Sequence, residues 1–232
     1  MNGHGVTAEE YLSPDIPSGL SWRELPIVDA RDPSLAEMLI VVTGDPRDFE
    51  VPIVPWPVPG GRPLDPATGV GGGSTEGAFT CTWSGDRLMA MNDAVGGHYV
   101  LGYACAPEDA DDRPRTAPPA QVLLWHVNHH PDGGQMFASL DGQPFLVPAM
   151  PAGESPDLDR AVIARSDGTF AICLQPGVWH DGVYPEQGDG NFWTRQGRVH
   201  ARVSADIARE FGCLLRVPLN SPSLDQHRTR NT

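Results

Sequence analysis

Short runs of apolar residues recur along this chain, separated by turns rich in Gly, Pro and Asp. Runs of this length, many of them alternating with polar positions, predict β-strands rather than helices. A proline-rich stretch at residues 51–59 favours an edge strand or an extended segment that wraps the sheet, because proline cannot donate to a ladder. The other predicted strands are residues 39–42, 78–83, 88–92, 98–104, 121–127, 136–140, 143–150, 170–174, 192–193, 199–203 and 214–219.

Helical patterns are few and short. One short helix is predicted before the strand at residues 39–42 and a second at residues 157–164. A third is predicted at residues 205–211, where Gly212 suits the position just after a helix end. Many strands with little helix predict an all-β barrel or sandwich.

The pattern predicts one β domain over residues 22–219, between a flexible arm at residues 1–21 and a polar tail at residues 220–232. Residues 107–119 are charged and proline-rich and could divide two domains. A long loop within one domain is preferred, because neither side alone has enough strands to close a barrel.

The charge of the chain limits the classes of partner that it can bind. The formal net charge of −14 disfavours nucleic acid and anionic membrane surfaces. No apolar run is long enough for a membrane helix, and the first residues lack the pattern of a signal peptide. The four cysteines form no C-x-x-C motif, which predicts free thiols and a cytoplasmic location.

All 16 basic residues are arginine, and the chain has no lysine. Schiff-base chemistry on a side-chain amine is therefore excluded. A P-loop, whose lysine holds phosphates, is excluded as well.

Two turns about fifty residues apart carry the main candidate chemistry. The first places His130 before a glycine turn that leads to Gln135, and the second places His180 just after a Pro-Gly turn. They resemble the two cupin motifs, in which hairpins on opposite walls of a small β-barrel direct side chains into one pocket. His130, Gln135 and His180 are therefore the predicted catalytic residues. Strand alternation places His126 on the face of His130, as a further possible pocket residue, and His129 on the other face.

The same comparison weakens the case for a metal. A metal-binding cupin usually supplies a His-x-His pair, a Glu and a further His, whereas this chain has Asn128 and Gln135 in place of the first His and the Glu. Nickel or zinc could still bind His130 and His180 together with water. The cofactor is left open.

A longer series of motifs resembles the ureidoglycolate lyase family, over about residues 125–184. The segments are H-P-x-G-x-Q-x-F from His130, L-x-G-x-x-F-x-V from Leu140, P-D-L from Pro156 and G-V-W-H from Gly177. The resemblance implies a cupin-like β-barrel (a double-stranded β-helix) and a carbon–nitrogen lyase that releases glyoxylate and urea from ureidoglycolate, in purine (allantoin) degradation. The family often has a second His where this chain has Asp181, which leaves the exact reaction open.

The residue types suit that reaction. Cleavage of a carbinolamide needs a base for the hydroxyl proton and an acid for the departing nitrogen. His180 and His130 titrate near neutral pH, and His180 is the expected principal acid/base. Asn128 offers amide groups that match a ureido group, and Asp181 could orient an imidazole.

Other substrate contacts are predicted around these residues. Trp179 is expected to form an apolar wall of the pocket. Arg198 is the candidate for the substrate carboxylate, with Arg165 and Arg195 as alternatives. Further pocket candidates in the N-terminal half are Glu76, Asn92 and His98.

Two alternatives remain open. One is a related cupin enzyme that acts on another small hydroxy- or amido-acid, and the other is a non-catalytic cupin that binds a small ligand. The expected partner is a small-molecule carboxylate, and a homodimer formed through edge strands is the default assembly.

Overall fold

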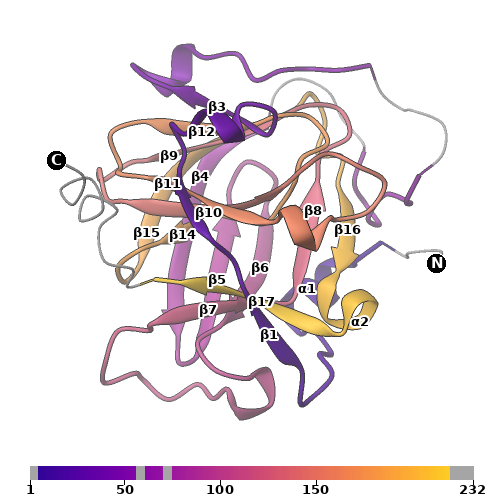
Figure 1. Cartoon of the computed structure of the whole chain (residues 1–232), viewed down its shortest axis with the longest axis vertical. Helices are drawn as coiled ribbons and strands as arrows, with labels where there is room; N and C mark the ends of the chain where they lie inside the picture. Colours follow the sequence, from indigo (N-terminus) through magenta and orange to yellow (C-terminus); the bar gives the residue numbers. More distant parts are fainter. Residues whose placement is uncertain (1–4, 56–60, 70–74, 220–232) are drawn as a thin grey trace, which may run out of the picture.

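The computed structural model describes residues 5–55, 61–69 and 75–219. Part of the predicted edge strand at residues 51–59 and the predicted tail at residues 220–232 lie outside the described residues. Within them the all-β prediction is confirmed: the chain forms two β-sheets and two short α-helices (Figure 1). Neither described helix is long and apolar enough to cross a membrane.

The first sheet has the strand order β1-β17-β7-β6-β5-β4-β15-β9-β12-β3. Its strands are β1 (Ser21–Glu24), β3 (Leu39–Val42), β4 (Thr75–Ser84), β5 (Arg87–Asn92), β6 (Gly97–Tyr103), β7 (Gln121–Leu124), β9 (Gln135–Ser139), β12 (Ala171–Leu174), β15 (Gly190–Gln196) and β17 (Cys213–Pro218).

The second sheet has the order β16-β8-β13-β10-β11-β2, and β14 also pairs with β10. Its strands are β2 (Ile27–Asp29), β8 (His126–His129), β10 (Phe145–Met150), β11 (Val162–Ser166), β13 (Trp179–His180), β14 (Tyr184–Pro185) and β16 (Val203–Asp206). The two ends of each sheet do not pair with each other among the described strands. The fold is cupin-like, but the expected barrel is not closed by hydrogen bonds.

Two predicted elements are corrected. Only η4 (Leu158–Arg160) is helical within residues 157–164, and β11 begins at Val162, because this segment pairs with both β10 and β2. Of the strand predicted at residues 199–203, only Val203 belongs to one. The residues before it form a loop in which the N–H groups of Arg198 and Val199 donate to Asp132.

The remaining helical elements are short. They are α1 (Ala8–Leu12), α2 (Ile207–Phe211) and the 3-10 turns η1 (Pro33–Leu35), η2 (Pro46–Asp48) and η3 (Pro107–Asp109). Helix α2 ends as predicted at Gly212, whose φ of 67° lies in the left-handed region that glycine adopts without strain.

The N-terminal segment is held on the core rather than loosely attached as expected for residues 1–21. Thr7 and Glu10 form a capping box at the start of α1. Tyr11 is only 1% exposed, and its ring meets those of Tyr99 and Trp125 edge-on. One buried aromatic ring thus fixes α1 against β6.

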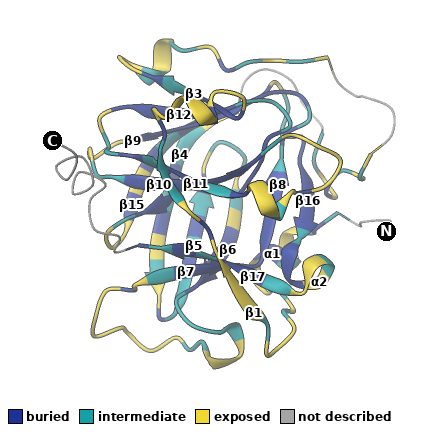
Figure 2. Cartoon of the chain, in the orientation of Figure 1, coloured by how far each residue is buried: buried dark blue, intermediate teal, exposed yellow. Residues whose placement is uncertain are grey.

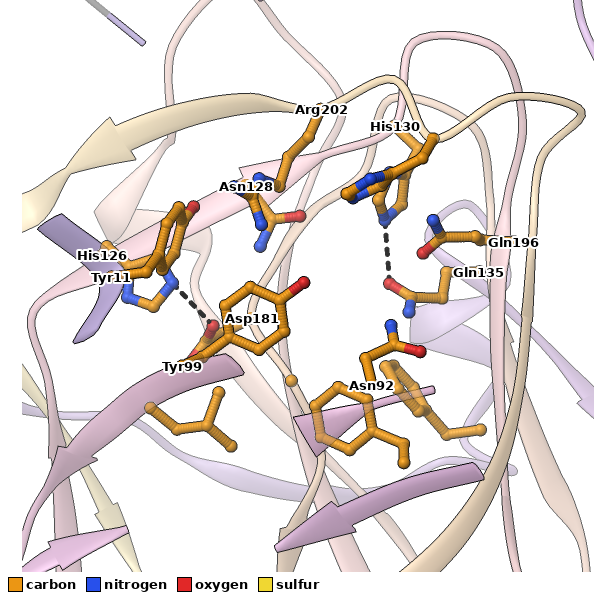
Figure 3. A pocket seen from close by; sticks show the side chains of 15 residues that line it. Tyr11, Asn92, Tyr99, His126, Asn128, His130, Gln135, Asp181, Gln196 and Arg202 are labelled. Atoms are coloured by element: carbon orange, nitrogen blue, oxygen red, sulfur yellow. Dashed lines mark hydrogen bonds and ion pairs between the residues drawn. The ribbon is translucent and has the colours of Figure 1, made fainter. Parts of the chain in front are cut away.

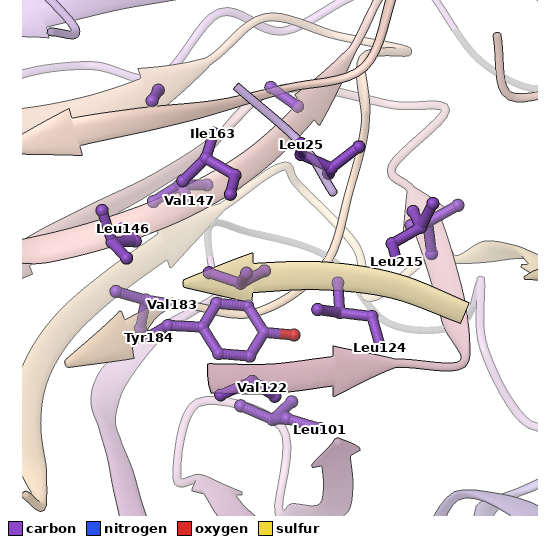
Figure 4. Close-up of a cluster of buried hydrophobic side chains, with 14 of the residues drawn as sticks. Leu25, Leu101, Val122, Leu124, Leu146, Val147, Ile163, Val183, Tyr184 and Leu215 are labelled. Carbon is purple, nitrogen blue, oxygen red and sulfur yellow. The ribbon is translucent and has the colours of Figure 1, made fainter. Parts of the chain in front are cut away.

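One apolar core joins the two sheets. Buried residues are concentrated in the strands, and exposed ones lie mainly in the loops and in β1 (Figure 2). Leu124 and Leu215 of the first sheet lie in one cluster with Val147 and Ile163 of the second (Figure 4). Strands β6 and β7 are neighbours across the 107–119 loop. We therefore still propose a single domain over residues 22–219, and this core holds the strands that carry the candidate site.

Candidate functional site

A cavity with about 380 Å³ of empty space, its open mouth included, lies between side chains of α1 and of both sheets (Figure 3). Most of its lining residues carry polar side chains, and aromatic and aliphatic side chains complete the wall. The lining residues are Tyr11, Phe79, Asn92, Tyr99, Leu101, His126, Asn128, His130, Gln135, Phe137, Asp181, Gly182, Gln196, His200 and Arg202.

The structure brings His130, Gln135 and His180 together as predicted. Antiparallel pairing sets His180 opposite Asn128, and this aligns the two turn motifs. The Nε2 atoms of His130 and His180 each lie 2.9 Å from Oε1 of Gln135. The two imidazole rings are 5.4 Å apart between centroids.

Hydrogen bonding assigns the protons of this group. Nδ1 of His130 donates to the carbonyl of Ala201 at 2.8 Å, and Nδ1 of His180 donates to that of Val178 at 2.7 Å. Burial lowers the pKa of His130 and lowers that of His180 to about 3. Both imidazoles are therefore neutral near pH 7, and each Nε2 presents a lone pair to the Gln135 amide.

Two facing acceptors do not form a hydrogen bond. Amide orientation is assigned from the hydrogen-bond network, and a half-turn of the Gln135 amide presents its two N–H donors to the two imidazoles. Its oxygen then accepts from the hydroxyl of Thr194, which lies 3.2 Å from the other end of the amide. We assign this orientation, which satisfies all the groups.

His180 differs from the other two members of this group. It is 2% exposed and does not line the cavity, whereas His130 and Gln135 do. His180 therefore lies behind Gln135. This position corrects the expectation that His180 itself meets the substrate.

Asp181 lines the cavity and orients an imidazole, but that imidazole belongs to His126 and not to His180. Its Oδ1 lies 3.1 Å from Nε2 of His126, and both side chains are 1% exposed. Its Oδ2 accepts a short hydrogen bond from the hydroxyl of Tyr184. Burial raises the pKa of Tyr184 well above its usual range, so this phenol stays a donor.

Two of the predicted substrate contacts are not brought to the cavity. Trp179 donates its indole N–H to the carbonyl of Gly153, and its ring meets His129 edge-on. Arg198 is exposed on its loop. Neither residue lines the cavity, while Asn128 does.

The other arginines considered are held elsewhere by carboxylates. Arg165 pairs with Glu186 at 2.5 Å, and Arg195 pairs with Glu76 at 2.6 Å. Of the N-terminal candidates, Asn92 lines the cavity, but Glu76 and His98 do not.

The cationic group of the cavity is Arg202, which the sequence reasoning missed. It is 7% exposed, pairs with Asp65 at 2.5 Å and lies with its guanidinium 4.0 Å from the ring centre of Tyr11. The available signal was an arginine between the apolar residues Ala201 and Val203, inside a predicted strand.

Gln196 is a second residue that sequence reasoning missed. It ends β15 and lines the cavity beside Gln135 (Figure 3). Its Nε2 is buried and has no hydrogen-bond partner among the described residues. A buried amide donor without a partner is costly, so a ligand acceptor at this point would stabilise it.

The donors present do not fit a metal site. His130 and His180 each donate Nδ1 to a carbonyl, as metal-binding histidines do. The third group, however, is the neutral amide of Gln135. No cluster of three or more His, Cys, Asp or Glu side chains suited to an ion occurs in the described part of the chain. Catalytic zinc takes three protein ligands, drawn from imidazole, carboxylate and thiolate. We derive no step through a metal.

Lowering the pH from about 6.5 to about 4 should lower the free energy of unfolding. An unfolded histidine titrates near 6.5, whereas burial lowers the pKa of His180 to about 3 and that of His129 to about 4. In this window the unfolded chain binds protons that the folded chain does not. Stability is therefore complete above about pH 6.5 and is lost below it, by about 1.4 kcal/mol per pH unit for each such histidine.

Urea denaturation at several pH values and constant ionic strength measures this slope. His180→Gln keeps a hydrogen-bonding side chain but does not titrate, so it should flatten the slope. An equal slope in both proteins would contradict the assignment of a neutral His180.

The sequence of this chain is similar to that of known proteins. The family model for ureidoglycolate lyase matches residues 91–206, half of the 232-residue chain. Curated relatives named ureidoglycolate lyase include those of Azotobacter vinelandii (32% identical over 74 residues), Pseudomonas syringae pv. tomato (36% over 67) and Stutzerimonas stutzeri (39% over 62).

These alignments are partial. They cover 32%, 28% and 27% of this chain, respectively, and 45%, 38% and 36% of the relatives. The chain thus spans less than half the length of these relatives, while the family match contains Asn92, His130, Gln135, Asp181 and Arg202. On the strength of the family match, the chain belongs to the ureidoglycolate lyase family.

Proposed function

We propose that this protein is a carbon–nitrogen lyase that converts ureidoglycolate into glyoxylate and urea. The observation that carries the proposal is a small polar cavity with amide groups on one side and a buried arginine on the other (Figure 3). Ureidoglycolate has a ureido group at one end and a carboxylate at the other, so its two ends match these two sides.

The amide side suits the ureido group. Asn92, Gln135 and Gln196 lie next to one another there (Figure 3). The unpartnered Nε2 of Gln196 can donate to the ureido carbonyl, and side-chain oxygens of the group can accept from ureido N–H groups. Asn128 lies near Arg202 on the other side.

The opposite side suits the carboxylate. A guanidinium binds a carboxylate through paired N–H donors and stays charged at neutral pH. Arg202 takes the role that the sequence suggested for Arg198. Asp181, which also lines the cavity, is the proposed contact for the hydroxyl group.

The reaction moves one proton from oxygen to nitrogen. As the hydroxyl proton leaves, the C–O bond becomes a carbonyl, the C–N bond breaks and the urea nitrogen takes up a proton. We propose that His130 and Gln135 touch the reacting groups, with the substrate hydroxyl replacing the Gln135 amide as the donor to Nε2 of the neutral His130 imidazole. His180 then acts through Gln135, as a positioning residue.

The proposal has three finer points. They are a role in purine (allantoin) degradation, which the family implies, a cytoplasmic location, which the absence of a C-x-x-C motif suggests, and a homodimer. Edge strands such as β3 and β16 are the surfaces through which two copies of a β protein can pair.

Racemic ureidoglycolate supplied to the purified protein should yield urea and glyoxylate in equal amounts, measured by NMR.

Gln196→Leu should raise KM about three- to tenfold, because one neutral hydrogen bond is lost. Gln143→Leu is the matched control, since Gln143 bonds Asp141 and Asp189 outside the cavity.

Other outcomes separate the alternatives. Turnover of another hydroxy- or amido-acid without urea release would favour a related cupin enzyme. A rise in melting temperature with glyoxylate, but no turnover of any such acid, would favour a ligand-binding cupin.

A further inference from the structure

The N-terminal segment forms part of the cavity wall. Tyr11 of α1 lines the cavity, and Asp65 lies directly behind it, paired with Arg202. Both residues lie outside residues 91–206, the part of the chain that matches the family model. Arg202 lies inside that match. Tyr11 and Asp65, which lie outside the family match, therefore contact Arg202, which lies inside it.

These groups form a continuous hydrogen-bonded chain. The hydroxyl of Ser204 donates its one proton to Oδ2 of Asp65 at 2.6 Å. The hydroxyl of Tyr11, which lies 2.6 Å from the hydroxyl of Ser204, must therefore be the donor in the bond between them. The same carboxylate oxygen accepts from Nε of Arg202, while Oδ1 accepts from the N–H of Val6 at 3.0 Å. The two hydroxyls, the carboxylate of Asp65 and Nε of Arg202 thereby all have partners, and buried networks of this kind are rigid.

The network fixes Arg202 on two sides. Asp65 holds the edge of the guanidinium that carries Nε, and the ring of Tyr11 covers one face at 4.0 Å. The ring centre of Tyr99, which also lines the cavity, lies 5.5 Å from the guanidinium of Arg202. A guanidinium has five N–H donors, so its two Nη atoms keep donors for a ligand.

The charges of the group are stable in this arrangement. Burial lowers the pKa of Arg202, but the paired carboxylate of Asp65 helps to raise it above its ordinary range. Burial raises the pKa of Tyr11 far above its usual value, so the phenol stays neutral. Arg202 is thus a cation that lies against a neutral phenol at neutral pH.

From these contacts we propose that Tyr11 is a positioning residue for substrate binding, which aims the Arg202 guanidinium at the substrate carboxylate. This inference deepens the proposed function and rests on it. The part of the chain outside the family match would then set affinity for the carboxylate end. The amide side of the cavity, with Asn92 and Gln196, would be unaffected.

Two variants separate the roles of the ring and the hydroxyl. Tyr11→Leu removes the aromatic face from Arg202, whereas Tyr11→Phe keeps the face and removes only the hydrogen bond to Ser204. A cation–π contact contributes more when it is shielded from water than at an exposed site. Tyr11→Leu should therefore weaken binding of glyoxylate about tenfold, and Tyr11→Phe should weaken it less.

The readouts distinguish positioning from loss of structure. Titration calorimetry with glyoxylate probes the carboxylate side, and titration with urea probes the amide side. Tyr11→Leu should weaken only glyoxylate binding, and it should raise KM for ureidoglycolate more than it lowers kcat. Tyr103→Leu is the matched control, because Tyr103 is a buried tyrosine that does not line this cavity.

The outcomes that would overturn the inference are specific. Equal weakening of glyoxylate and urea, or an equal effect of Tyr103→Leu, would show a structural role only. Unchanged glyoxylate binding in a folded Tyr11→Leu protein would remove the role altogether. These probes need no turnover, so a wild-type protein that binds glyoxylate but releases no urea would refute the proposed reaction and leave the positioning role standing.

Discussion

Arg202→Met should lower the free energy of unfolding by about 3–5 kcal/mol, the usual cost of removing one partner of a buried ion pair. Methionine approximates the length of the arginine stem, so the main loss is the charge. The substitution leaves the carboxylate of Asp65, which is fully buried, without its cation. It also removes the proposed partner of the substrate carboxylate. Urea denaturation gives the first effect, and KM for ureidoglycolate gives the second.

The double variant Asp65→Asn/Arg202→Met tests the reason for this loss. It removes both charges, so it should recover much of the lost stability but none of the lost substrate affinity. A single variant as stable as the wild type would show that the pair is not energetically coupled. Recovery of affinity in the double variant would show that Arg202 does not bind the carboxylate.

Gln135→Glu should lower kcat by about 10²–10³, the range found when one preorganised donor is removed from a reacting site. The carboxylate offers His130 and His180 an acceptor where the wild type offers two donors. It also stabilises the charged forms of the two imidazoles and so raises their pKa values. The same change completes a set of two histidines and one glutamate, a common zinc site.

Calorimetry with Zn²⁺ or Ni²⁺ should therefore detect one bound ion per chain in Gln135→Glu. Gln135→Glu/His180→Gln is the matched control, because it keeps the new carboxylate but has only one of the two imidazoles, and it should not bind the ion. Wild-type activity should survive exhaustive chelation. Loss of wild-type activity on chelation, restored by nickel or zinc, would instead make His130 and His180 metal ligands.

The strands were predictable where the signal was local. Residues 88–92 and 214–219 alternate or stay apolar between clear turns, and strands lie there. The helix prediction for residues 157–164 was wrong because the acidic start of this segment is typical of a helix, whereas β-branched Val162 and Ile163 follow it. Pairing with β2 and β10 makes the second half of the segment a strand, and the sequence of one segment does not show which strands it will pair with.

The same distinction holds for the site. His130, Gln135 and His180 could be found because each follows or precedes a recognisable turn. Arg202 and Asp65 are 137 positions apart in the chain, and no local pattern joins them. Tyr11 lies in a segment whose composition indicates a loose arm, and only its burial against Tyr99 and Trp125 reverses that view.

The pairing of β1 with β17 has a consequence for how the molecule folds. In these parallel strands Ser21 pairs with Cys213, so this sheet edge forms only after the segment around Cys213 has been synthesised. The cavity likewise collects groups from Tyr11 to Arg202. Chains dominated by such distant contacts fold slowly, in milliseconds to seconds, since loop closure comes before any compensating contact. The ability to bind substrate would therefore appear only when folding is complete, and it would be the last property that a newly synthesised chain gains.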